Sequence, residues 1–240
     1  MAAPAAITGV SGTVRVGKLR QFAWRHPEWW ALAFSCCAWS VVVVKAFDPH
    51  AHHAEMGAGW LARTVHWQWM TMAMMLPLML EQVRTIAARS FWRRRNWAIA
   101  EFVAGYLVLW ALAGVVVSMV PSFGEAAWVG AFVVAAAWQL TSMKRRALLT
   151  CHRTMPLAPY GWAARRDCLI HGWSTGMRCF VSCWALMLAC AMSGHGLFAA
   201  IGLSAVSIAE RYQRRPDQRL LALAVLAIGL LTWLVPATLS

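Results

Sequence analysis

The chain has 240 residues, of which 60% are hydrophobic and only 13% are charged, with a mean hydropathy of +0.54. A soluble domain of this length rarely has such a composition, so the sequence indicates a membrane protein. The formal net charge of +13 does not indicate nucleic-acid binding, because the basic residues lie in short clusters between apolar runs and no groove-reading element is visible.

Long uncharged runs recur along the chain, and an apolar run of about 18 residues or more is typical of a membrane span. Helices satisfy their own backbone hydrogen bonds and can therefore cross a bilayer singly. We predict an all-α, polytopic transmembrane bundle that forms one domain over residues 29–240, after a basic cytoplasmic segment, residues 1–28. The predicted spans, about seven, are residues 29–47, 64–82, 97–119, 126–143, 173–192, 195–209 and 219–236.

The basic residues predict the orientation of these spans. All 22 Lys and Arg except Lys45, Arg63 and Arg178 lie before span one or in the segments after spans two, four and six. With seven spans these four segments fall on one side of the membrane, which the positive-inside rule makes cytoplasmic. We therefore expect the N-terminus inside and the C-terminus outside, in a bacterial inner membrane.

The first outer loop, residues 48–60, is rich in histidine. It contains His50, His52, His53, Glu55 and Met56 within seven positions. Neutral imidazole is a common ligand for zinc, copper and nickel, so the loop could capture such an ion. The alternative is a solvated loop that simply tolerates histidine.

Span two contains a stripe of soft ligands. His66, Met70 and Met74 are spaced by four and share one face of a helix, with Pro77 near the inner third. Methionine is also a common gap-filling residue of packed cores, and that interpretation stays open for the stripe alone. We expect Pro77 to kink the helix.

Span five contains a second stripe, which runs in the opposite direction. Its members are Cys179, Cys183, Met187 and Cys190, with His195 just beyond the outer end. If spans two and five pack together, Met74 lies near Cys183, Met70 near Met187 and His66 near Cys190. Thiolate and thioether ligands select copper(I), and cysteine with histidine also suits zinc. We therefore predict a copper or zinc site between the two stripes; the alternative is that these thiols are small hydrophobic residues of a core.

Three motifs resemble an uncharacterised bacterial family of predicted metal-binding integral membrane proteins, a domain of unknown function. Trp67, Met70, Ala73, Met74, Met75 and Pro77 match an aromatic-x-x-M-x-x-A-M-M-x-P element. The segments QLTSMKRRALLTC, residues 139–151, and GWSTGMRCFVSCWALM, residues 172–187, resemble the other two. Ala147 and Ser182 stand where the family usually has cysteines, and Ser142 where it has proline. The resemblance implies metal binding, with two of the usual cysteines replaced.

Two ionisable residues lie at membrane depth. Glu101 in span three and Arg178 in span five are at similar depth, and we predict that they form a structural ion pair. The alternative is that each side chain extends to the cytoplasmic surface.

The leading prediction is an inner-membrane protein that binds copper or zinc, with copper favoured, for metal handling or delivery. We find no motif of an enzyme, so no catalytic activity is expected. Haem is not expected either: His66 and His195 could face each other as its ligands, but the other features of a redox subunit are missing. The first alternative is a non-catalytic accessory or scaffold subunit of a larger membrane complex, and the second is an ion permease. Expected partners are membrane lipid and either other membrane subunits or a periplasmic metal-binding protein.

Overall fold

The chain folds into helices, as a computed structural model shows, and no strand occurs in the residues that it describes. These residues are 26–47, 59–119, 125–151, 155–194, 196–213 and 216–234. The helices are α2 (Trp29–Ala46), α4 (Trp60–Met75), η1 (Leu76–Met79), α5 (Leu80–Arg89), η2 (Trp92–Arg94), α6 (Arg95–Met119), α7 (Glu125–Gln139), α8 (Ser142–Thr150), α9 (Gly161–Met192), α10 (Leu197–Tyr212) and α11 (Gln218–Leu234). The predicted all-α class is therefore confirmed, and a helix lies close to each predicted span.

Three of these helices are long and apolar enough to cross a membrane, namely α2, α6 and α9. Two further apolar helices are shorter, at Ala127–Gln139 and Gln218–Leu234. With a rise of 1.5 Å per residue, α9 is about 48 Å long and exceeds the hydrocarbon thickness of about 30 Å. By this criterion the described structure has three candidate spans, and the prediction of seven goes beyond it.

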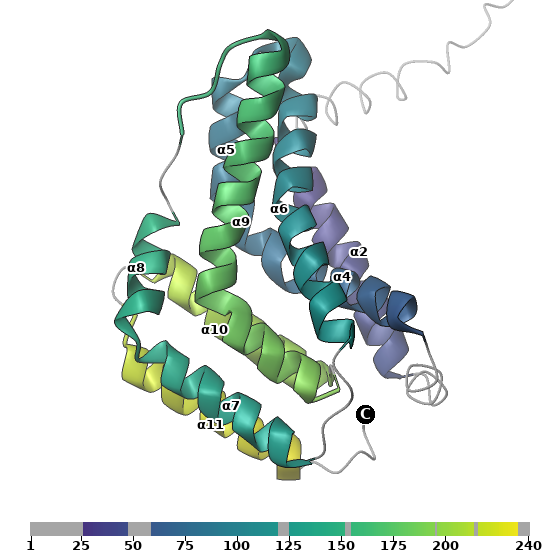
Figure 1. The fold of residues 1–240 in the computed structure, drawn as a ribbon, viewed down its shortest axis with the longest axis vertical. Coiled ribbons are helices and arrows are strands. Elements are labelled where there is room, and N and C mark those ends of the chain that lie inside the picture. Colours follow the sequence, from purple (N-terminus) through teal and green to yellow (C-terminus); the bar gives the residue numbers. More distant parts are fainter. Residues whose placement is uncertain are drawn as a thin grey trace, which may run out of the picture.

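Span two is interrupted where Pro77 was expected to kink it. The α-helix α4 ends at Met75, the 3-10 turn η1 contains Pro77, and α5 then continues to Arg89. Proline lacks an amide hydrogen and its ring clashes with the preceding turn, which explains the change of helix type at this position. Figure 1 shows the result, since α4 and α5 run in different directions.

The most extensive packing joins α6 to α9. Glycines make this approach possible: a Cβ atom on Gly172 would collide with the carbonyl oxygen of Phe102, and one on Gly105 with that of Leu169. Gly172 and Gly176 form the small-x-x-x-small pattern that lets helix backbones approach closely in membranes. The glycines of the third motif therefore position the cysteines that follow them on α9.

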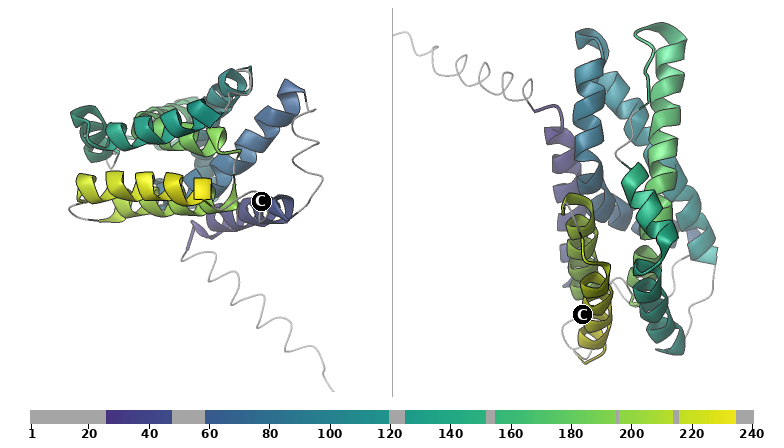
Figure 2. Two further views of the ribbon diagram at one scale, coloured as in Figure 1. Left: turned by 90° about the horizontal axis from the view of Figure 1, so that it is seen from below. Right: turned by 90° about the vertical axis from the view of Figure 1, so that its left-hand side faces the viewer.

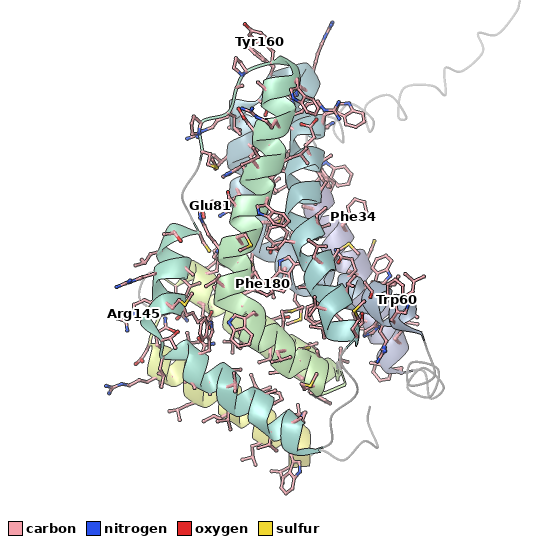
Figure 3. All side chains as sticks on the ribbon, in the orientation of Figure 1. Phe34, Trp60, Glu81, Arg145, Tyr160 and Phe180 are labelled. Atoms are coloured by element: carbon pink, nitrogen blue, oxygen red, sulfur yellow. The ribbon has the colours of Figure 1, made fainter. Side chains whose placement is uncertain are left out.

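The other helices surround this pair. The helix α4 packs against α2 and α6, and α7 packs against α9 and α11, as the lower part of Figure 1 shows. In the right-hand view of Figure 2, α2 (purple) and the upper part of α9 (green) lie on opposite sides of the molecule. Large apolar side chains cover the exterior, and Figure 3 labels Phe34 and Trp60 among them; both are more than half exposed.

A candidate soft-metal site

The sulfur atoms of two distant segments meet in the core. The thiol of Cys179 on α9 donates to the thioether of Met75, the last residue of α4, with 3.9 Å between the sulfur atoms. The hydroxyl of Tyr106 on α6 donates to the sulfur of Cys179 at 3.1 Å. Met75, Tyr106 and Cys179 are all almost completely buried. Three helices thus converge on one thiol.

A second thiol lies one helical turn away on α9. It is Cys183, whose sulfur lies 3.3 Å from the hydroxyl oxygen of Ser182. Ser182 in turn donates to the backbone carbonyl of Cys179 at 2.9 Å. We call Met75, Cys179 and Cys183 the sulfur site.

A third cysteine approaches this site from another element. Cys151 caps the end of α8, is fully buried and lies near the Arg211 side chain on α10. Its charge would interact with those of Cys179 and Cys183. Burial raises the pKa of the Cys151 thiol, and Arg211 offsets this only in part, so Cys151 is protonated at neutral pH.

A buried ion pair supports the same corner of the bundle. Lys144 donates to Glu210 at 2.9 Å, and both side chains are only 1% exposed. Thr141 caps α8 by accepting from the backbone amide of Lys144, which fixes the start of that helix. The second motif, residues 139–151, therefore builds a buried corner that holds α8 against α9 and α10.

The predicted ligands of span two are buried, but their contacts differ from the expectation. Met70 and Met74 lie in the core, and the sulfur that reaches Cys179 belongs to Met75, one position further along. His66 packs near α2, where its Nδ1 accepts from the Lys45 ammonium at 3.2 Å. In the neutral imidazole this bond leaves the proton on Nε2, so metal binding through Nε2 requires a change of tautomer.

The predicted ligands of span five are all buried on α9: Cys179, Cys183, Met187 and Cys190. They belong to the same hydrophobic core as Met70, Met74 and Met75. The contacts of Met187 with Met70 and of Cys190 with His66 stay predictions. His50, His52, His53 and His195 lie outside the described residues.

Glu101 has two arginine partners. Its oxygens accept from Arg94 of η2 at 2.8 Å and from Arg165 of α9 at 3.0 Å, so this carboxylate near the start of α6 is satisfied. Because these two arginines already balance the negative charge of Glu101, the predicted ion pair between Glu101 and Arg178 is not required for that purpose. The pair stays a prediction.

Sequence reasoning missed Met75, Tyr106 and Cys151 as members of this neighbourhood. Met75 lies in the first of the three motifs and Cys151 in the second. Membership of these motifs was the sequence signal that could have identified the two residues. Within the described residues no group of three or more His, Cys, Asp and Glu side chains could hold one metal ion. A metal at the sulfur site would therefore depend on the thioether of Met75 together with the thiols.

These features define a helical protein with a buried cluster of sulfur side chains. The chain matches the family described as "PpoB2: Copper chaperone" over residues 64–235, which is more than half of its length, and it belongs to this family. The matched range includes Met75, Cys151, Cys179 and Cys183. No curated protein and no solved structure matches the chain.

Proposed function

We propose that the protein is an inner-membrane copper chaperone that holds copper(I) at the sulfur site and passes it on without catalysing a reaction. The observation that carries this proposal is the contact of Cys179 with Met75, made at 3.9 Å between sulfur atoms. The family membership supports the identity of the metal. Zinc is the alternative cargo.

The spacing of the sulfur atoms suits one shared metal ion. Metal–sulfur bonds of about 2.3 Å place two sulfur ligands of one ion no more than about 4.6 Å apart. The 3.9 Å between Cys179 and Met75 falls within this limit without a rearrangement of the backbone. Thiolate and thioether together select copper(I) over harder cations.

The surroundings of Cys179 suit ligand exchange. A copper(I) ion that binds the thiol replaces its proton, so the thiol can no longer donate to Met75 and the thioether lone pairs become available to the metal. Tyr106 continues to donate to the Cys179 sulfur, which orients it as outer partners orient metal ligands. The apolar core around the site excludes water from the ion.

The proposed location is a membrane crossed by seven spans with the N-terminus inside. Two features support this: exposed apolar side chains cover the exterior, and the helix ends that this topology places outside gather towards the lower right of Figure 1. Lipid would then surround the bundle. A C-terminal alkaline phosphatase fusion should be active in cells, and an inactive fusion would contradict the orientation.

In this topology the histidine loop faces the periplasm. His50, His52 and His53 would capture the metal there, and His66, Cys190 and His195 would lie between the loop and the sulfur site. A periplasmic metal-binding protein, or other subunits of a membrane complex, would be the partner that gives or receives copper.

Copper content tests the proposal directly. The full chain, purified in mild detergent with a reductant, should bind copper(I), and the Cys179→Ser/Cys183→Ser variant should lose this copper. The matched control is Cys36→Ser/Cys37→Ser, because these two cysteines are exposed on α2 and it should retain copper like the wild type. Equal copper in all three proteins, or none in the wild type, would refute the site.

A metal-free protein that co-purifies with fixed partners would instead favour the accessory-subunit alternative. The exposed apolar exterior is the observation consistent with it.

A further inference from the structure

A cavity of about 950 Å³ lies where α8, the end of α10 and the start of α11 meet. Its wall includes Arg145 from α8, Arg211 from α10 and Arg219 from α11, and we call it the arginine cavity. Arg145 and Arg219 are exposed, and Figure 3 shows Arg145 at the edge of the molecule, so a ligand can enter from outside. The volume is of the size that small-molecule sites have.

The buried ion pair at this corner brings two of the arginines together. Lys144 of α8 donates to Glu210 of α10 at 2.9 Å. Arg145 and Arg211 are the next residues along these two helices, so the pair holds both of them at the cavity. Because Lys144 already balances the charge of Glu210, that carboxylate does not offset the charge of the two guanidinium groups.

The other carboxylate of the wall belongs to Asp217 and caps a helix. It accepts from the backbone amides of Arg219 at 2.9 Å and of Leu220 at 3.5 Å, at the start of α11. In the part of the chain that the structure describes, no carboxylate forms an ion pair with Arg145, Arg211 or Arg219. The wall therefore has an excess of positive charge, and guanidinium groups bind phosphate with charge-assisted, often bidentate, hydrogen bonds.

A second cavity, of about 340 Å³, lies between α7 and α11, which pack side by side in Figure 1. Its lining is apolar, and we call it the apolar groove. Leu226 and Leu230 line it about two and three helical turns after Arg219, so the three residues share one face of α11. Val133 lines it about two turns before Leu140, a residue of the arginine cavity. The two cavities therefore follow one another along the same side of the helix pair.

The distance between the cavities suits a lipid. A rise of 1.5 Å per residue places Leu226 and Leu230 about 10 and 16 Å along α11 from Arg219. The hydrocarbon of one bilayer leaflet is about 15 Å deep. Leu226, Leu230 and Val133 are also exposed, so an acyl chain can contact them. A lipid with its phosphate in the arginine cavity would thus reach the apolar groove, whereas a small phosphate compound would not.

We propose that the arginine cavity binds the phosphate group of an acidic phospholipid, whose acyl chain lies in the apolar groove. In the proposed topology this cavity lies on the cytoplasmic side, where basic pockets between helices bind acidic headgroups. The excess positive charge favours an acidic lipid over a zwitterionic one, whose own cation it repels. The proposal uses the proposed topology but not the sulfur site, which shares no residue with either cavity.

Lipid binding to the full chain, delipidated in mild detergent and measured by native mass spectrometry, tests this proposal. Dioleoyl phosphatidylglycerol should bind about tenfold more tightly than dioleoyl phosphatidylcholine. The Arg145→Gln/Arg219→Gln variant should lose about tenfold in affinity for phosphatidylglycerol. Both residues are exposed, so the fold should be kept. The matched control is Arg93→Gln/Arg146→Gln, which removes the same charge from exposed residues outside the cavity wall and should bind like the wild type.

Glycerol 3-phosphate separates a lipid from a soluble phosphate compound. It should not compete with phosphatidylglycerol at the same concentration, and equal competition would overturn the lipid. Equal affinity for the two lipids, or a variant that binds like its control, would overturn the arginine cavity as a headgroup site. Copper(I) content of the same samples is a separate readout: both double variants should keep the wild-type amount, so a failure of lipid binding leaves the proposed function as it stands.

Discussion

The thiol of Cys179 donates to the thioether of Met75 although the two residues are 104 positions apart. Met75 is the last residue of α4, directly before the 3-10 turn that contains Pro77. The contact determines which methionine of span two is expected to bind metal.

We predict that Met75→Leu weakens copper(I) binding by about tenfold and changes the thermal midpoint little. Leucine has nearly the volume of methionine, so the stability cost is below about 1.5 kcal/mol, but it offers the metal no lone pair. Competition titration with a copper(I) chelator measures the affinity. Met74→Leu is the matched control and should bind copper(I) like the wild type. If Met74→Leu weakened copper(I) binding more than Met75→Leu, the site predicted from sequence spacing would be favoured.

The helices could be predicted from the sequence because an apolar run long enough to cross a bilayer favours a helix, which satisfies its own backbone hydrogen bonds. The positions of α6, α9 and α11 agree with the predicted spans to within a few residues, apart from the long N-terminal extension of α9 over residues 161–172. This extension carries the polar residues Arg165, Arg166 and Asp167, which hid the helix from a search for apolar runs.

The site was only partly predictable, because a stripe of soft ligands on one helix does not identify the helix that packs against it. Spacing by four selected Met74, whereas the end of α4 brings Met75 to Cys179. Cys151 lies in the basic segment after span four, where no buried site was expected. Its position near Arg211 depends on how α8 folds back against α10. Such long-range contacts are set by packing and not by local pattern.

The close approach of α6 and α9 gives a second prediction. In Gly172→Ala the new methyl group would meet the Phe102 carbonyl, and the two helices would have to separate. We expect a loss of about 1–3 kcal/mol in unfolding free energy, measured by denaturation in detergent, together with weaker copper binding. Gly130→Ala on α7 is the control, since nothing lies within 4 Å of its Cβ position, and an equal effect there would contradict the packing argument.

The buried pair of Lys144 and Glu210 gives a third prediction. Lys144→Met leaves a carboxylate buried without its cation, which typically costs about 3–5 kcal/mol. The double variant Lys144→Met/Glu210→Leu removes both charges and should recover most of this loss. Unfolding free energies of the wild type and both variants measure the effect. A double variant as unstable as the single one would show that the pair does more than balance charge.

The contact of Glu28 with Arg84 gives a pH-dependent prediction. Glu28 is buried, and its carboxylate accepts from Arg84 at 2.7 Å and approaches His26 at 3.4 Å. Burial alone would raise the pKa of Glu28, but the hydrogen bonds and the Arg84 charge outweigh it and lower that pKa below its ordinary value of 4.5. The contact joins the start of α2 to α5, at the inner ends of both helices in the proposed topology.

A carboxylate whose folded pKa is lowered stabilises the fold above its unfolded pKa, and this stability is lost as the pH falls through the folded pKa. Glu28→Gln should therefore lower the thermal midpoint at pH 7, and the difference from the wild type should shrink as the pH falls below the ordinary pKa of 4.5. Arg84→Gln should show the same trend, since it removes the cation that lowers the pKa of Glu28. Thermal unfolding in detergent between neutral and acidic pH measures both variants. A deficit that stayed constant over this range would mean that Glu28 stabilises the start of α2 through packing and not through its charge.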